Sequence, residues 1–320
     1  MKKLILHVGY PKTGTTSLQN SLFLKLNNKI NYLGIAKAPR SDYHHLLRRV
    51  LRPWLASEGQ DGREELNLLL DDRINSGINL MSEECFINSR NNLGPLIDPF
   101  EIKRLLLPKF DSIDIVIVIR NQVELIYALY ANGGLLDKYG NILNTDDYIN
   151  MCLNDKKYRP FFSFSDVIEK YKSAFGNNKV HVLFFEDFLF NKDQYYDKWA
   201  EILNTPQDFL LKVMGDSHLH KKQKTSDGSY IFKIKIQPNK IKKFIKSIPF
   251  TQSVFMRLSK YKIVKNISLS ANKRTNKELK VELFNDAEKL RIKKSFFKDN
   301  LILLKVTNSD EVKLKKYNYL

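Results

Sequence analysis

A loop of the size that holds a phosphate group joins an apolar strand to a helix near the start of this chain. Leu4 to Val8 is an apolar run that ends at Gly9, and from Ser17 onward apolar residues recur at helical spacing. The N–H groups of a first helical turn have no partner inside the helix and lie at the positive end of its dipole. The sequence therefore predicts that a phosphate or sulfate group binds where this helix begins.

The glycines of this loop, Gly9 and Gly14, have the spacing of a P-loop, but the lysine is displaced. Thr15 stands where a P-loop NTPase has its lysine, and Lys12 lies inside the loop instead. No nearby residue is arranged in the usual way to hold Mg²⁺ between two phosphates. A tight strand-to-helix turn without a ligand is the alternative, and it gives no reason for a lysine and several hydroxyls.

A second apolar run ends in an arginine. Ile115 to Ile119 has the β-branched composition of a strand buried on both faces of a parallel sheet, and Arg120 follows it. An NTPase normally has an aspartate for Mg²⁺ at this place, whereas an arginine presents a bidentate fork to another phosphate. The sequence thus favours a metal-free site for an anionic ligand, and an Arg120 held in an ordinary salt bridge is the alternative.

The string Pro-Lys-Thr-Gly-Thr-Thr-x-Leu-Gln at residues 11–19 resembles the 5′-phosphosulfate loop of sulfotransferases that use 3′-phosphoadenosine 5′-phosphosulfate (PAPS). The stretch after the second run resembles their 3′-phosphate motif, an arginine followed eight residues later by a serine. The eighth residue here is Ala128, so the hydroxyl is missing. The resemblance implies PAPS as the donor, no metal, and a PAPS site made of Lys12, Thr13, Gly14, Thr15, Thr16, Ser17, Arg120 and the Ala128 position.

Three weaker segments extend the resemblance along the chain. Ser82-Glu83-Glu84, after a third strand, resembles the Ser-Ser-Glu of bacterial carbohydrate sulfotransferases. Glu186-Asp187-Phe188 resembles the Tyr-Glu-Asp that follows a strand in the family. Asn300 with Leu303 and Leu304, and then Tyr317 to Leu320, resemble the family's C-terminal ending.

Transfer of a sulfuryl group to a hydroxyl needs a cation at the leaving phosphate oxygen and a base for the acceptor proton. The resemblance gives the first task to Lys12. Glu83 is the first candidate for the base and Glu84 the second; a carboxylate that only caps a helix start is the alternative for Glu83. His7 is a further candidate, although a core histidine is the commoner outcome on a strand.

Two neighbouring histidines, His44 and His45, are candidates for acceptor contacts. They lie at the start of a helical pattern at residues 43–52, in the region where the family admits its acceptor. A solvated helix start is the alternative for both.

Strand-like runs near 3–8, 31–35, 78–82, 113–119 and 179–185 alternate with helical patterns near 15–28, 43–52, 63–75, 99–107, 122–132, 163–175 and 193–203. This alternation predicts an α/β fold with a P-loop-like parallel sheet flanked by helices, followed by a basic, helical C-terminal region. At 320 residues we expect one sulfotransferase domain, with a core at 1–205 and 280–320 and a basic insertion or subdomain at 215–280.

Most of the positive charge is local. Residues 218–280 hold seventeen Lys or Arg and two acids, hence +15 of the chain's formal +18. Basic and apolar side chains interleave at 241–248 and 255–258, a pattern that suits a segment lying on anionic lipid. An anionic acceptor or a merely solvated insertion would also explain it, and with few aromatic residues and no known module nucleic acid is not the expected partner.

The two cysteines, Cys85 and Cys152, form no metal-binding or disulfide pattern. No signal peptide and no apolar run of about eighteen residues is present. We expect a cytoplasmic, bacterial-type enzyme, peripheral at the inner face of the cell membrane.

The sequence thus predicts a PAPS-dependent sulfotransferase acting on a hydroxyl of a saccharide or glycolipid. Two alternatives stay open: a metal-dependent nucleotide kinase or NTPase, opposed by Thr15 and Arg120, and a non-catalytic anion-binding relative, which Ala128 leaves possible.

Overall fold

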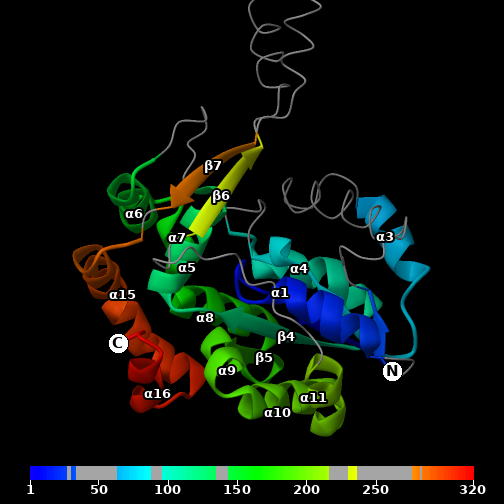
Figure 1. Ribbon diagram of the computed structural model, residues 1–320. Coiled ribbons are helices and arrows are strands. Elements are labelled where there is room, and N and C mark those ends of the chain that lie inside the picture. Colours follow the sequence, from blue (N-terminus) through cyan, green and yellow to red (C-terminus); the bar gives the residue numbers. More distant parts are fainter. Residues whose placement is uncertain are drawn as a thin grey trace, which may run out of the picture. The chain divides into compact units, whose positions relative to one another are not determined.

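The computed structural model describes residues 1–26, 30–33, 63–87, 96–134, 143–215, 230–235, 276–281 and 283–320. The chain divides into two compact units (Figure 1). The first comprises Met1–Lys221 and Phe284–Leu320, and the second Lys222–Leu283. The second unit overlaps residues 215–280, where the sequence predicts a basic insertion or subdomain.

A five-stranded parallel sheet forms the centre of the first unit, in the order β2-β3-β1-β4-β5. The strands are β1 (Lys2–His7), β2 (Ile30–Tyr32), β3 (Gly77–Ser82), β4 (Ser112–Ile119) and β5 (Val180–Phe184). In the register, His7 at the end of β1 is opposite Ser82 of β3 and Val116 of β4. The loop that follows β1 therefore leaves the sheet between the carboxyl ends of β3 and β4, where open α/β sheets bind their ligands. The predicted α/β fold with a parallel sheet is confirmed.

Helices surround this sheet (Figure 1). Those up to β5 are α1 (Thr15–Ser17), α3 (Arg63–Asp71), α4 (Pro99–Leu106), α5 (Gln122–Leu129), α6 (Thr145–Asn154), α7 (Arg159–Phe162) and α8 (Phe164–Phe175). Those after it are α9 (Phe185–Phe190), α10 (Lys192–Leu203), α11 (Gln207–Gly215), α15 (Asp286–Thr307) and α16 (Glu311–Lys316). The helix predicted at 43–52 lies outside the described residues.

The first helix differs from the prediction in its winding. Only Thr15–Ser17 is α-helical; Leu18–Leu22 is wound as a π-helix and Phe23–Lys25 as a 3-10 helix. Single π turns inside helices are frequent at functional sites. The apolar spacing predicted a helical run here but carries no information about a change of winding.

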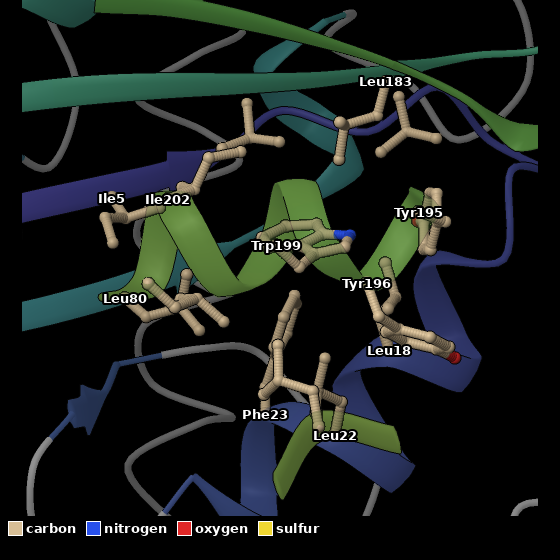
Figure 2. Close-up of a cluster of buried hydrophobic side chains, with 14 of the residues drawn as sticks. Ile5, Leu18, Leu22, Phe23, Leu80, Leu183, Tyr195, Tyr196, Trp199 and Ile202 are labelled. Atoms are coloured by element: carbon tan, nitrogen blue, oxygen red, sulfur yellow. The ribbon is translucent and has the colours of Figure 1, made fainter. Parts of the chain in front are cut away.

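Trp199 of α10 lies at the centre of the core on one face of the sheet (Figure 2). Ile5 of β1 and Leu183 of β5 contribute from the strands, and Leu22 and Phe23 from the turns after α1. This packing fixes the segment after the loop against the sheet. The opposite side includes α8, which packs against β4, β5 and α15.

In the second unit, β6 (Tyr230–Lys235) and β7 (Asn276–Val281) pair in antiparallel fashion, with Tyr230 opposite Val281. The predicted basic stretch thus contains strands at these residues.

The C-terminal residues of the first unit are helical. Helix α15 starts at a capping box formed by Asn285 and Glu288, and α16 lies beside α9 near the C-terminus (Figure 1).

Candidate anion-binding site

The loop between β1 and α1 contains two residues in the left-handed backbone region. Gly14, at the N-cap of α1, has φ 79°, and Lys12 has φ 68°. The Thr13 hydroxyl donates to the Tyr10 carbonyl at 2.5 Å and closes the turn. The N–H groups of Thr15 and Thr16 belong to the first helical turn, where helix geometry supplies no acceptor. The loop can therefore offer backbone donors to an anion.

Gly9 allows the loop to lie close to the strand it leaves. A Cβ atom at Gly9 would lie 2.7 Å from Oγ1 of Thr15 and 3.1 Å from the ring of His7. Any larger residue would push the start of α1 away from β1. In the sequence, Gly9 stood out only by its spacing from Gly14. The structure adds a steric reason for a glycine at this position.

The Ser17 N–H donates to the Gly14 carbonyl at 2.9 Å, so this donor is turned into the helix. The prediction placed Ser17 among the anion ligands. Its hydroxyl remains the group that could serve this role.

Arg120 meets the loop at Lys12, although 108 residues separate them in the sequence. One guanidinium N–H donates to the Lys12 carbonyl at 3.1 Å, and another donates to Oε2 of Glu124 at 3.0 Å. The guanidinium carbon lies 5.1 Å from the centroid of the Phe185 ring. Because a guanidinium has five N–H donors, this arginine can hold the loop and still bind an anion.

Ala128 lies partly exposed on α5, the helix that follows Arg120. Its methyl group can donate no hydrogen bond. That another donor replaces the missing hydroxyl, or that nucleotide affinity is lower, stays a prediction.

Glu83 follows β3 directly and is 6 % exposed. Its backbone N–H donates to the His7 carbonyl at 3.2 Å, which places it at the same edge of the sheet as the loop. Burial, together with the nearby Glu83 charge, raises the pKa of the Tyr32 hydroxyl far above its usual value. Glu84 is partly exposed and begins a short 3-10 turn that ends at Phe86. Both carboxylates thus follow the strand next to β1.

His7 is fully buried. Its Nδ1 lies 2.8 Å from the Ser82 hydroxyl, and the Gln19 amide donates to the same hydroxyl at 3.1 Å. Phe23 and Trp199 pack edge-on to the imidazole. Burial lowers the pKa of His7 to about 3, which makes it a weak base at neutral pH. This is the environment of a core histidine, the alternative that the sequence left open for His7.

His44 and His45, predicted to contact the acceptor, lie outside the described residues.

Asp187 and the C-terminal residues form a cluster for which sequence reasoning predicted no role. The Tyr317 hydroxyl donates to Oδ1 of Asp187 at 2.6 Å, and the Lys313 ammonium lies 2.8 Å from Oδ2. Lys198 lies 3.9 Å from the same oxygen. Glu186-Asp187 and Tyr317–Leu320 each resemble a segment of the same family. This shared resemblance could have suggested that the two segments are in contact.

Within the described residues, no group of three or more His, Cys, Asp or Glu side chains is placed to hold a metal ion. No helix in the described part of the chain is long and apolar enough to cross a membrane.

No protein-family model and no curated protein matches the sequence. Among solved structures, the chain is similar to a sulfotransferase from Alicyclobacillus acidocaldarius, with 13 % identity over 97 % of this chain and 98 % of that chain and a TM-score of 0.51. Mouse sulfotransferase SULT7A1 complexed with PAP matches with 12 % identity over 69 % and 68 % and a TM-score of 0.40. The sulfotransferase domain from the curacin biosynthetic pathway matches with 14 % identity over 66 % and 77 % and a TM-score of 0.36. The chain therefore has the sulfotransferase fold predicted from its sequence, on the evidence of the first of these structures.

Proposed function

We propose that the protein is a PAPS-dependent sulfotransferase that moves a sulfuryl group to a hydroxyl of a saccharide or glycolipid. The observation that carries the proposal is the contact between Arg120 and the Lys12 carbonyl, within this fold. It joins the two segments whose motifs resemble the two phosphate-binding motifs of such enzymes. Two cationic side chains and a turn of backbone donors fit a ligand with two separate phosphate groups.

In this proposal the loop holds the 5′-phosphate. The N–H groups of Gly14, Thr15 and Thr16 and the hydroxyl of Ser17 would donate to it, and Arg120 would bind the 3′-phosphate. PAPS, when bound, supplies a sulfuryl group on a good leaving phosphate. Lys12 would neutralise the negative charge that develops on the leaving oxygen.

The acceptor proton needs a base at the same edge of the sheet. Glu83 is the proposed base because it is buried and follows the strand next to β1. As the acceptor oxygen bonds to sulfur and the bond from sulfur to the 5′-phosphate oxygen breaks, Glu83 would take the hydroxyl proton. Glu84 is the second candidate, one residue further on and more exposed.

The nature of the acceptor rests on the resemblance of residues 82–84 to bacterial carbohydrate sulfotransferases. The basic segment at 218–280 fits an enzyme that works on anionic lipid at the inner face of the membrane. Both are parts of the proposal.

Calorimetric titration with 3′-phosphoadenosine 5′-phosphate (PAP), and separately with Mg-ATP, tests the nucleotide. We expect metal-independent binding of PAP that weakens at least 10²-fold in Arg120→Ala, because a charged hydrogen-bond donor is lost from a phosphate site. Tighter binding of Mg-ATP would overturn the proposal in favour of a kinase. Binding of PAP without sulfate transfer to any acceptor in a saccharide and glycolipid panel would indicate the non-catalytic relative.

A further inference from the structure

Phe185 and Glu186, the first two residues of α9, constrain Arg120 and the residue that follows it. The Phe185 ring lies under the guanidinium, and a Cβ added to Gly14 would lie 3.1 Å from the same ring. Glu186 holds the backbone: its Oε1 accepts the N–H of Asn121, the residue after Arg120, at 2.9 Å. The guanidinium and the peptide next to it are therefore both fixed by consecutive residues of one turn.

Glu186 is in turn held by the C-terminal residues. The Tyr319 hydroxyl donates to Oε2 of Glu186 at 3.3 Å. Tyr319 is almost fully buried, with its ring edge-on to Phe184 at 5.6 Å. Its carbonyl accepts from the Asn300 amide at 2.8 Å. Glu186 itself is 4 % exposed, so its carboxylate is shielded from solvent.

Asn121 links Glu186 to the start of helix α5. Its side-chain oxygen accepts the Glu124 N–H at 3.0 Å and caps the helix, while its amide donates to the Tyr317 carbonyl at 3.1 Å. With its N–H on Glu186, Asn121 is bonded through its backbone and its side chain. The point from which the Arg120 side chain leaves the backbone is thus set by Glu186 and by the C-terminal residues.

We propose that Glu186, held by Tyr319, is a positioning residue that fixes Arg120 beside the loop and thereby sets the preference for a nucleotide with a 3′-phosphate. The inference rests on the proposed function, in which Arg120 binds that phosphate. An arginine side chain loses much rotational freedom when it binds a ligand, and holding it in place beforehand reduces this cost. Loss of the positioning should weaken the 3′-phosphate contact and leave the 5′-phosphate contact unchanged.

Tyr319→Phe is the variant of choice because it removes one hydroxyl and keeps the buried ring. We expect about a 3- to 10-fold loss of affinity for PAP, the effect of one hydrogen bond, with the affinity for adenosine 5′-phosphate unchanged. Glu186→Ala should lose more, and Glu186→Gln should recover most of that loss, since its side-chain oxygen still accepts the Asn121 N–H. The measured quantity is the ratio of the two dissociation constants, by calorimetry.

Tyr317→Phe is the matched control. Tyr317 lies two residues away and donates to Asp187, so this variant should lower the melting temperature but keep the ratio of the wild type. Equal losses for both nucleotides in Tyr319→Phe, or the same change of ratio in both tyrosine variants, would reduce Glu186 to a structural role. A wild type that binds PAP no more tightly than adenosine 5′-phosphate would overturn the proposed function, and this inference with it.

Discussion

Arg120 and Asp187 follow the neighbouring strands β4 and β5, but the surroundings of their two charges differ. Asp187 is fully buried and is matched by Lys313 and by the Tyr317 hydroxyl. Arg120 bonds a backbone carbonyl and Glu124, whose side chain is 54 % exposed. Buried charges need partners inside the protein, and Asp187 has them. Arg120 instead shares its charge with a solvent-exposed carboxylate at the edge of the loop, and such surface pairs are weak enough for an anionic ligand to compete with.

We expect from this difference that the Asp187 cluster stabilises the fold, and that the Arg120 region serves the proposed binding and transfer. Substitutions in the first should lower the free energy of unfolding. Substitutions in the second should lower activity or change ligand affinity at nearly constant stability.

Lys12→Ala should have the largest effect. We expect turnover to fall by about 10³ or more, because charge on the leaving phosphate oxygen loses its neutralising partner. Alanine in the same left-handed conformation carries a similar backbone penalty, so chemical denaturation should show nearly unchanged stability. Sulfate transfer from labelled PAPS measures the first quantity, and retained turnover would contradict the mechanism.

Asp187→Asn should lower the free energy of unfolding by about 3 to 5 kcal/mol, because it removes the buried carboxylate that Lys313 and Lys198 both face and leaves these two ammonium groups without their counter-charge. The matched control is Asp71→Asn: Asp71 pairs with Lys109 on the surface, where a lost pair costs up to about 1 kcal/mol. Urea unfolding of both variants measures the difference. Equal effects would remove the distinction between the Asp187 cluster and an ordinary surface pair.

Glu186 connects the two regions, and its protonation should be visible in the stability. Burial raises its pKa from 4.5 to about 7, against the opposing effect of the Asn121 hydrogen bond and the Arg120 charge. Between these pH values the folded chain keeps a proton that the unfolded chain has lost. This contribution is complete below pH 4.5 and is lost as the pH rises through 7.

Relative to Glu186→Gln, the wild type should therefore lose about 2.5 kcal/mol of unfolding free energy between pH 5 and pH 8. The difference between the two proteins removes the contribution of His7, whose lowered pKa acts in the opposite direction below pH 6.5. Parallel pH profiles would contradict a buried Glu186 that titrates near neutrality.

Glu83→Gln should lower turnover by about 10², the usual contribution of a general base, with the affinity for PAP unchanged. Glu84→Gln is the matched control on the adjacent residue and should retain most activity. The reverse outcome would assign the base to Glu84.

Glu124→Gln should have the smallest effect, and an opposite sign. Removing the exposed partner of Arg120 frees the guanidinium for an anion, so affinity for PAP should rise by up to about fivefold at low salt, the range of a surface ion pair. The gain should shrink as salt is added. Weaker binding would show that Glu124 helps to hold Arg120 in its binding position.

The sequence predicted the features that depend on local pattern. Strand-like runs were predicted close to all five strands β1 to β5, and the glycine spacing marked the loop. The meeting of Arg120 with the loop could be anticipated because carboxyl ends of parallel strands share one edge. The π winding after Ser17, and helices α6, α9 and α11, were not predicted, since tertiary packing decides them.

The hydrophobic periodicity could not predict the contacts of the C-terminal residues, for a different reason. Tyr319 and Glu186 are 133 residues apart, and nothing in the periodicity of either segment specifies the other. His7 shows that the sequence could also suggest a role that the surroundings do not favour. A histidine is a candidate base by residue type, but the contacts with Phe23, Trp199 and Ser82 make His7 part of the core.

The left-handed backbone of Lys12 has a consequence for anyone who evolves this protein in the laboratory. A side chain in that conformation costs about 1 to 2 kcal/mol, a penalty that glycine escapes. Selection for thermal stability alone should therefore favour glycine at position 12 and yield stable variants without activity. Under the proposed mechanism, a search for a more stable variant must also select for turnover in every round, because stability and sulfuryl transfer favour different residues at position 12.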